Sequence, residues 1–202
     1  MITEKYLIFT GRPNAGKSSI IKKLVGINVK TGKHPGTTRN IKKYPLNHGL
    51  ILVDMPGFGK MMGASKRLEN MMNDRIIHFL ESNAQKIILV IHVIDITKFI
   101  ETTQRLEKKG IISVDIEMIK FLTKTLHEFP LVAANKIDKT DTGIIETNLQ
   151  DFMKRINNGN LSAVTHKIFP VSAKTGEGVS ALKNTIHQKL VAKGYKTPFK
   201  VR

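Results

Sequence analysis

Short apolar runs rich in β-branched residues alternate along the chain with longer stretches in which apolar residues recur at helical spacing. The short runs are typical of strands and the longer stretches of helices, so their alternation predicts βαβ units and a mostly parallel sheet. The predicted strands are Tyr6–Thr10, Ile41–Pro45, Leu50–Asp54, Ile87–Asp95, Leu131–Asn135 and Ile168–Val171. The predicted helices are Ser18–Val25, Lys66–Ala84, Asp115–Phe129, Thr142–Ile156 and Val179–Ala192.

The same pattern predicts which strands lie inside the sheet. Ile87–Asp95 is almost continuously apolar, as expected for a central strand that is covered on both faces. Ile41–Pro45 and Leu50–Asp54 flank a short turn containing Asn-His-Gly, which predicts an antiparallel hairpin, and its proline favours an edge strand. His92, within the apolar central run, is interpreted as a core histidine with satisfied hydrogen bonds rather than a metal ligand.

Several other segments carry definite expectations. Thr97–Ser113 is charged and is interpreted as an exposed insertion with a short helix, and Asn28–Arg39 is predicted to be a polar loop. Residues 1–193 are expected to form one domain, followed by a basic, loosely held tail at 194–202. For Met61 and Met62 the choice between core packing and a partner surface stays open. The helix Lys66–Ala84 is expected to bury a stripe consisting of Leu68, Met71, Met72, Ile76, Phe79 and Leu80.

The composition excludes several classes of protein. The 202 residues include no cysteine, so the chain holds neither disulfides nor a thiolate metal site, and a cytoplasmic location is expected. Its apolar runs are far shorter than the roughly 18–20 residues of a membrane-spanning helix. The amino terminus lacks the layout of a secretory signal. We therefore expect no membrane partner.

The charge is high and uneven. There are 33 Lys and Arg residues against 16 Asp and Glu residues, which gives a formal net charge of +17. No acidic residue lies between Glu4 and Asp54, and from Lys154 onward Glu177 is the single one. Such clustering favours a polyanionic partner, nucleic acid before membrane, over a charge that only maintains solubility. Contacts to phosphates are expected from Lys30, Lys33, Lys42 and Lys43.

A glycine-rich segment between the first predicted strand and the first predicted helix fits G-x-x-x-x-G-K-[ST]. In this context backbone N–H groups and a helix amino terminus wrap phosphates, Lys17 reaches the β- and γ-phosphates, and Ser18 offers a hydroxyl to Mg²⁺. The alternative is a glycine-rich turn whose lysine is only solvated. The motif predicts a nucleoside triphosphate without identifying its base. The nucleotide-binding set here is Gly11, Arg12, Pro13, Asn14, Ala15, Gly16, Lys17, Ser18 and Ser19.

The sequence Asn-Lys-Ile-Asp directly follows the strand Leu131–Ala134. Its Asp138 carboxylate can accept hydrogen bonds from the ring N–H and the exocyclic amine of guanine, a pair of donors that adenine lacks. Asn135 can hold the loop, and the Lys136 stem can lie over the base. This position, at the carboxyl end of a parallel strand, is where open α/β sheets bind ligands. Backbone N–H groups near the guanine oxygen are expected from Ser172, Ala173 and Lys174.

Two further segments are placed to contact the γ-phosphate. Asp54 and Gly57 belong to Asp-Met-Pro-Gly, where Asp54 is expected to hold the Mg²⁺ shell and Gly57 to present its N–H. Gly36, Thr37 and Thr38 belong to Pro-Gly-Thr-Thr-Arg, and either threonine can supply a second hydroxyl to Mg²⁺. Loops that are held by a γ-phosphate and released on hydrolysis act as switches.

In order and spacing, these five motifs resemble those of the Ras-like translation-factor class of P-loop GTPases. Asp-Met-Pro-Gly-Phe-Gly-Lys from Asp54, and Val-Asp-Ile-Glu-Met from Val114, resemble the EngB (YihA) family of ribosome-biogenesis GTPases, in the TrmE–Era–EngA–EngB group. The resemblance implies an α/β, three-layer P-loop GTPase domain whose six-stranded, mostly parallel sheet has one antiparallel edge strand and helices on both faces. It also selects Thr38, with Ser18 and Asp54, for Mg²⁺.

The resemblance implies a slow GTPase that acts as a switch in large ribosomal subunit assembly, with a precursor particle and its rRNA as partners. We expect a monomer whose catalytic groups are Lys17, Thr38 and Gly57. Phe58 stands where Ras-like enzymes place a water-orienting glutamine, and Asn14 matches an asparagine with which relatives bind potassium. Together they suggest a K⁺ ion in addition to Mg²⁺.

Two alternatives stay open. One is a GTP-gated RNA- or ribosome-binding assembly factor with negligible intrinsic hydrolysis, which phosphate release with and without ribosomal particles distinguishes from a GTPase. The other is a P-loop kinase acting on a small metabolite, which is disfavoured because Asn-Lys-x-Asp has no role there.

Overall fold

The computed structural model describes residues 4–26, 40–60, 65–156 and 162–199. Its middle layer is a six-stranded sheet in the spatial order β2-β3-β1-β4-β5-β6. β2 and β3 pair antiparallel at one edge and the other pairs are parallel, which confirms the predicted sheet. The strands are β1 (Lys5–Gly11), β2 (Lys42–Pro45), β3 (Leu50–Asp54), β4 (Ile87–Asp95), β5 (Leu131–Asn135) and β6 (Ile168–Val171).

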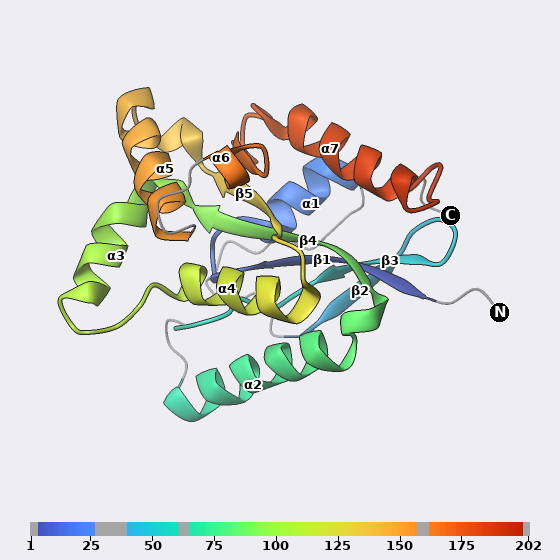
Figure 1. Cartoon of the computed structure of the whole chain (residues 1–202), viewed down its shortest axis with the longest axis horizontal. Coiled ribbons are helices and arrows are strands. Elements are labelled where there is room, and N and C mark those ends of the chain that lie inside the picture. The colour runs from blue at the N-terminus through green and yellow to red at the C-terminus, as the bar shows by residue number, and fades with distance from the viewer. Residues whose placement is uncertain (1–3, 27–39, 61–64, 157–161, 200–202) are drawn as a thin grey trace.

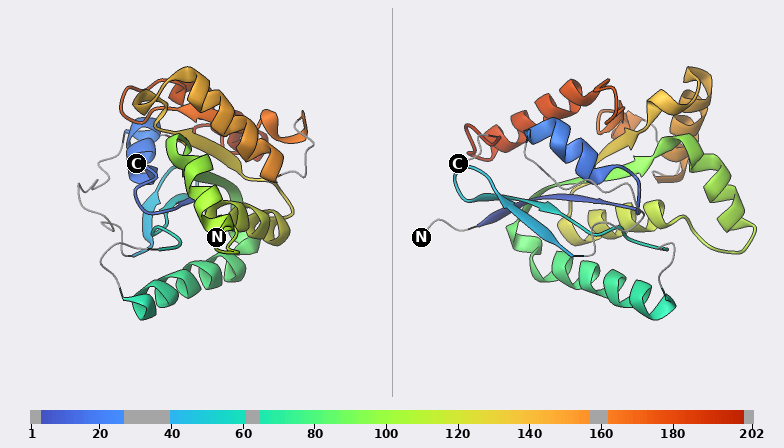
Figure 2. Two further views of the ribbon diagram at one scale, coloured as in Figure 1. Left: turned by 90° about the vertical axis from the view of Figure 1, so that its left-hand side faces the viewer. Right: turned by 180° about the vertical axis from the view of Figure 1, so that it is seen from behind.

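Helices cover both faces of this sheet, as predicted. α1 and α7 pack together on one face, and α2 and α4 lie on the opposite face (Figures 1 and 2). Within the described residues, no helix is long and apolar enough to cross a membrane. The helices are α1 (Lys17–Val25), α2 (Lys66–Ser82), α3 (Phe99–Glu107), α4 (Val114–Leu126), α5 (Thr142–Ile156), α6 (Ser162–Thr165) and α7 (Val179–Ala192). Short 3₁₀ turns are η1 (Ala84–Lys86), η2 (Ile96–Lys98) and η3 (Ile137–Lys139).

The core has two sides because successive side chains of a strand point to opposite faces. Phe9 of β1 and Ile91 of β4 pack with α1 and α7, whereas Ile8 and Val90 pack with α2 and α4. On the second side, Phe152 of α5 joins α4 against β5. Because both faces of the central strands are covered, a closely packed interior fixes the ends of these strands and the loops that follow them.

α2 buries a narrower stripe than the pattern predicted. Met72, Ile76 and Leu80 are buried and form one row at i, i+4 spacing. Met71 lies outside this row and is 52% exposed, and Leu68 in the first turn is 38% exposed, so the prediction that both belong to the core was wrong. Hydrophobicity and helical spacing alone do not tell how wide a face the sheet covers.

The segment 97–113, predicted to be an exposed insertion, packs one face of α3 into the core. Phe99 and Thr103 are buried, and the Phe99 ring meets the ring of Phe152 edge-on with centroids 5.1 Å apart. The buried Asn148 of α5 accepts a hydrogen bond from the Ile100 N–H. α3 is therefore attached to α5 by aromatic packing, and only its outer face is exposed.

Two other boundaries differ from the prediction. α4 ends at Leu126, because His127 adopts a left-handed conformation with φ 53°. Residues 194–199 of the predicted tail are not loosely held. Tyr195 and Phe199 pack against the core beside α7, and the side chain of Asn47 donates a hydrogen bond to Thr197 Oγ1 at 2.7 Å. The two aromatic residues of the tail, rather than its charge, decide where it lies.

Candidate nucleotide-binding site

The motif residues come together at the end of the sheet where the parallel strands have their carboxyl ends. The parallel strands β1, β3, β4, β5 and β6 all end there, and the loops that follow β1, β3, β5 and β6 carry the sequence motifs. β1 lies between β3 on one side and β4 on the other, which is the position where chain connections leave in opposite directions. Ligands of open α/β sheets bind at this point.

The loop between β1 and α1 is shaped by Gly16, which caps α1 in a left-handed conformation with φ 101°. A Cβ atom at this position would lie 2.1 Å from Asn135 Nδ2, so no larger residue fits. Within the described part of the chain no side chain caps α1, and its first turn contains no acidic residue. The first N–H groups of α1 and the positive end of its dipole are therefore available to an anion.

Lys17 is the buried cation of this loop. Its Nζ donates to the carbonyls of Gly11 and Arg12, at 2.9 Å each, and the side chain is almost completely buried. Burial lowers the pKa of Lys17 to about 8, against the opposing effect of the Asp54 and Asp115 carboxylates. A phosphate beside this ammonium would supply the countercharge that burial makes valuable.

Ser18 and Asp54 lie together, as the magnesium hypothesis requires. Ser18 Oγ donates to Asp54 Oδ2 at 2.7 Å, and burial raises the pKa of Asp54. Asp54 is completely buried, and its Oδ1 accepts no hydrogen bond from any residue that the structure describes. A hydroxyl oxygen beside a buried carboxylate oxygen with an unused lone pair suits a hard cation such as Mg²⁺.

Gly57 lies against the phosphate-binding loop. A Cβ atom there would lie 2.5 Å from the Pro13 backbone nitrogen, so the close approach requires glycine. The next residue, Phe58, donates its N–H to the Gly11 carbonyl at 3.2 Å, and its ring packs against the core on the α2 side. The Asp-Met-Pro-Gly segment is thus joined to the loop by its backbone.

The side chain of Asn135 connects three loops. Its Nδ2 donates to the Ala15 carbonyl at 2.7 Å, and its Oδ1 accepts from the Ala173 N–H at 2.9 Å. The predicted role of holding the loop is therefore visible in the geometry. The Ser172 and Ala173 N–H groups are both used inside the protein, by the Glu177 carbonyl and Asn135 respectively.

Asp138 is positioned by a neighbouring hydroxyl. Ser172 Oγ donates to Asp138 Oδ1 at 2.6 Å, and this bond is the main reason why the pKa of Asp138 is below its usual value. Asp138 Oδ2 is buried, lies 3.9 Å from Lys174 Nζ, and accepts no hydrogen bond among the described residues. One carboxylate oxygen is held and the other is available to a donor pair on a ligand.

Sequence reasoning missed the partner of Lys136. Lys136 adopts a left-handed conformation with φ 75°, and its Nζ contacts Asp95 Oδ2 at 2.5 Å. Asp95 ends β4 and lies opposite Asn135 in the register of β4 and β5. The sequence signal that could have identified this partner is an acidic residue at the end of a buried apolar strand.

His92 is buried, with partners on both ring nitrogens, which confirms its interpretation as a core histidine.

Some predicted site residues cannot be placed. Gly36, Thr37 and Thr38 lie outside the described residues, as do Lys30, Lys33, Met61 and Met62. Asn14 is exposed in the phosphate-binding loop, in a left-handed conformation with φ 62°. Among the residues that the structure describes, no group of three or more His, Cys, Asp or Glu could hold a metal ion.

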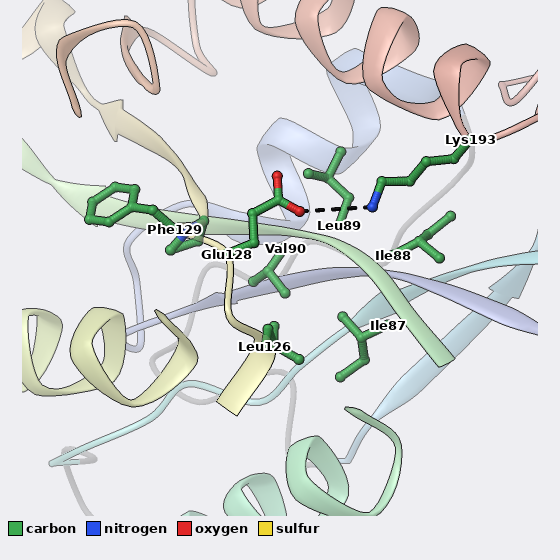
Figure 3. Close-up of a pocket in the computed structure, with 9 residues that line it drawn as sticks. Ile87, Ile88, Leu89, Val90, Leu126, Glu128, Phe129 and Lys193 are labelled. Carbon is green, nitrogen blue, oxygen red and sulfur yellow. Dashed lines mark ion pairs between the residues drawn. The ribbon is translucent and has the colours of Figure 1, made fainter. Parts of the chain in front are cut away.

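A separate cavity of about 90 Å³ lies at the other end of the strands, where β4 and β5 begin (Figure 3). It is lined by the first residues of β4, by the segment before β5 and by Lys193, whose ammonium pairs with Glu128 at 3.8 Å. None of the motif residues that the structure describes borders it. This cavity is therefore distinct from the candidate site.

Comparison with known proteins agrees with this geometry. Residues 6–136 match the family model described as "50S ribosome-binding GTPase". Probable EngB GTP-binding proteins of Archaeoglobus fulgidus and Pyrococcus horikoshii are 38% and 39% identical, over 93% and 90% of this chain and 93% and 82% of theirs. A crystal structure of a probable EngB protein covers 93% of this chain and 99% of its own, with 36% identity and a TM-score of 0.82. Era of Aquifex aeolicus, 23% identical over 91% of this chain and 56% of its own, with a TM-score of 0.63, shares the fold.

We expect Ser172→Ala to weaken binding of guanine nucleotides about tenfold to a hundredfold, the cost of one buried hydrogen bond to a charged group. The reason is that Asp138 loses the hydroxyl that holds Oδ1. Titration with a fluorescent GDP analogue measures this, and Ser180→Ala, an exposed serine on α7, is the control. Equal affinity of wild type and Ser172→Ala would show that Ser172 does not position the base-reading carboxylate.

Proposed function

This chain belongs to the 50S ribosome-binding GTPase family, among its EngB-type members, and from that premise we propose that it is a nucleotide-gated switch in large ribosomal subunit assembly. GTP binding and hydrolysis belong to the family. What we add for this chain are the residues that carry each step, the ion requirement and the surface that meets the ribosomal precursor.

The buried charges at the sheet edge support the assignment of the nucleotide contacts. Lys17 and the first turn of α1 would bind the β- and γ-phosphates, and Asp138 would accept from the guanine base. Ser18 and Asp54, with Thr38, would hold Mg²⁺, which supplies positive charge to the phosphates when it is bound. The protein's own contribution is to bury both charges and to orient them, Lys17 through the Gly11 and Arg12 carbonyls and Asp54 through the Ser18 hydroxyl.

The environment of Phe58 supports a hydrolysis mechanism without a water-orienting glutamine. Its ring is packed against the core, so no polar side chain stands directly after Gly57. We propose that Asn14, which is exposed in the phosphate-binding loop, contributes to a potassium site that supplies positive charge to the phosphates. Slow intrinsic hydrolysis is the expected consequence. In the alternative, an assembly factor with negligible hydrolysis, GTP acts only as a ligand that changes the conformation.

The distribution of charge on the α1 and α7 face supports a ribosomal RNA partner. Neither helix contains an acidic residue, and α1 exposes Lys22 and Lys23, whereas the exposed Lys183 of α7 lies over the Phe199 ring. By contrast, α2 on the opposite face mixes both signs of charge. Of the lysines expected to contact phosphates, Lys43 lies over the rings of Tyr6 and Phe79 and is engaged within the protein. The α1 and α7 face is thus the better candidate for RNA phosphates.

Potassium should raise the GTPase rate above that in sodium at equal ionic strength, and Asn14→Ala should remove the difference, because the ion loses its ligand. Release of inorganic phosphate under multiple turnover measures both effects. Equal turnover in the two salts would exclude the potassium site. No release in either salt, even with ribosomal particles, would favour the assembly factor with negligible hydrolysis.

Binding to large-subunit precursors should be tighter with a non-hydrolysable GTP analogue than with GDP, and should weaken steeply with salt. The double variant Lys22→Gln with Lys23→Gln should bind less tightly and with a smaller salt slope, because two phosphate contacts are lost. Co-sedimentation over a salt series measures this. The control replaces the exposed Lys120 and Lys124 of α4 with glutamine. Salt-insensitive binding, or equal loss in both double variants, would refute the assigned face.

A further inference from the structure

A buried polar chain lies beside the nucleotide site, and none of the nucleotide motifs accounts for it. Thr10 of β1 lies opposite His92 of β4 in the parallel register, and Thr10 Oγ1 is 2.9 Å from His92 Nδ1. His92 Nε2 is in turn 3.2 Å from Asp115 Oδ1, in the first turn of α4. All three side chains are buried, so these hydrogen bonds compensate for their loss of hydration.

The carboxylate fixes the direction of one of these hydrogen bonds. A carboxylate only accepts, so His92 Nε2 donates to Asp115, and Thr10 Oγ1 is the partner of the other ring nitrogen, Nδ1. Both ring nitrogens are then satisfied, and one oxygen of Asp115 is held against the central strand. The other oxygen, Oδ2, faces Arg12, whose Nη1 lies 3.9 Å away.

Arg12 connects this chain to the phosphate-binding loop. Its guanidinium pairs with the Asp115 carboxylate, and its side chain is 36% exposed. Its backbone carbonyl accepts one of the two hydrogen bonds that orient Lys17 Nζ. A displacement of the Arg12 backbone would therefore move an acceptor of the lysine that is placed to meet the phosphates.

We propose that Asp115 is a positioning residue of the nucleotide site, which holds Arg12 and thereby keeps the phosphate-binding loop in its receptive conformation, while His92 anchors Asp115 to the sheet. The neighbouring residue strengthens the case. Val114 packs against Gly59, where a Cβ atom would lie 3.0 Å from Val114 Cγ1. The first turn of α4 thus contacts both the phosphate-binding loop and the segment after Asp-Met-Pro-Gly.

This role differs from general support of the fold. The Arg12 side chain is 36% exposed, and the hydrogen bond from His92 to Asp115 does not involve Arg12. Loss of the Arg12–Asp115 contact should consequently alter the loop more than the stability of the chain. The proposal rests on the nucleotide site of the proposed function and does not depend on the ribosomal partner.

The test is a double-mutant cycle on nucleotide affinity, using the full chain. Arg12→Ala and Asp115→Asn, singly and together, are titrated with a fluorescent GDP analogue, and their thermal unfolding midpoints are recorded. Each single variant should raise the Kd about fivefold, and the double variant should be no weaker than the weaker single variant, because both remove one interaction. Arg12→Lys, which keeps a cation, should recover part of the affinity.

The matched control is an ion pair far from the site. Arg155 of α5 contacts Glu107 of α3, and Arg155→Ala with Glu107→Gln should leave the Kd unchanged. If the Arg12 and Asp115 variants have lower unfolding midpoints but an unchanged Kd, their role is purely structural. If the increase in Kd of the double variant equals the product of the two single increases, their effects are independent. Either result overturns the proposal. If Asp115→Asn does not fold, equal Kd values for Arg12→Ala, Arg12→Lys and wild type overturn it. A wild-type chain without GDP affinity would instead refute the proposed function itself.

Discussion

The candidate site depends on one buried amide, the side chain of Asn135, which ties together the loops after β1, β5 and β6. It donates to the Ala15 carbonyl and accepts from the Ala173 N–H, and it requires Gly16 beside it because any Cβ there would overlap its Nδ2. Removing either bond would leave a buried polar group unpaired, which costs more than the bond contributes when made. The loop predicted to hold phosphates and the loop predicted to read the base are therefore fixed relative to each other by contacts within the protein.

Near Asn135, the charged forms of Lys17 and Asp54 are destabilised by burial. Burial lowers the pKa of Lys17 and raises that of Asp54, so each charged form is less favourable in the fold than in water. A phosphate beside Lys17 and a cation beside Asp54 would relieve both. The basic surface of α1 and α7 is different, because its lysines are exposed and hydrated. The first arrangement suits a small ligand held tightly, and the second suits a large polyanion whose binding depends on salt.

The alternation of strands and helices, the sheet class and the grouping of four motifs at one edge were predictable, because each rests on local spacing and on the rule that parallel strands end together. Partnerships between distant residues were not. Asp95 with Lys136 and His92 with Asp115 join segments whose separation the pattern does not encode. The burial of α3 and of the tail was also missed, since charge dominated both segments and the decisive rings of Phe99, Tyr195 and Phe199 are few. For Met71 the error was the opposite: it was assigned to the core because it is apolar, but its side chain is exposed.

The central claim is that Asp138 reads guanine with the oxygen that Ser172 leaves available. The most direct measurement compares the Kd values for GTP and ATP in wild type, Asp138→Asn and the control Asp141→Asn, an exposed residue three positions further along. Asp138→Asn places an amide donor against the two donors of guanine, so the preference for GTP should fall by about a hundredfold or more. Asp141→Asn should keep the wild-type preference. An unchanged preference in Asp138→Asn would contradict the account.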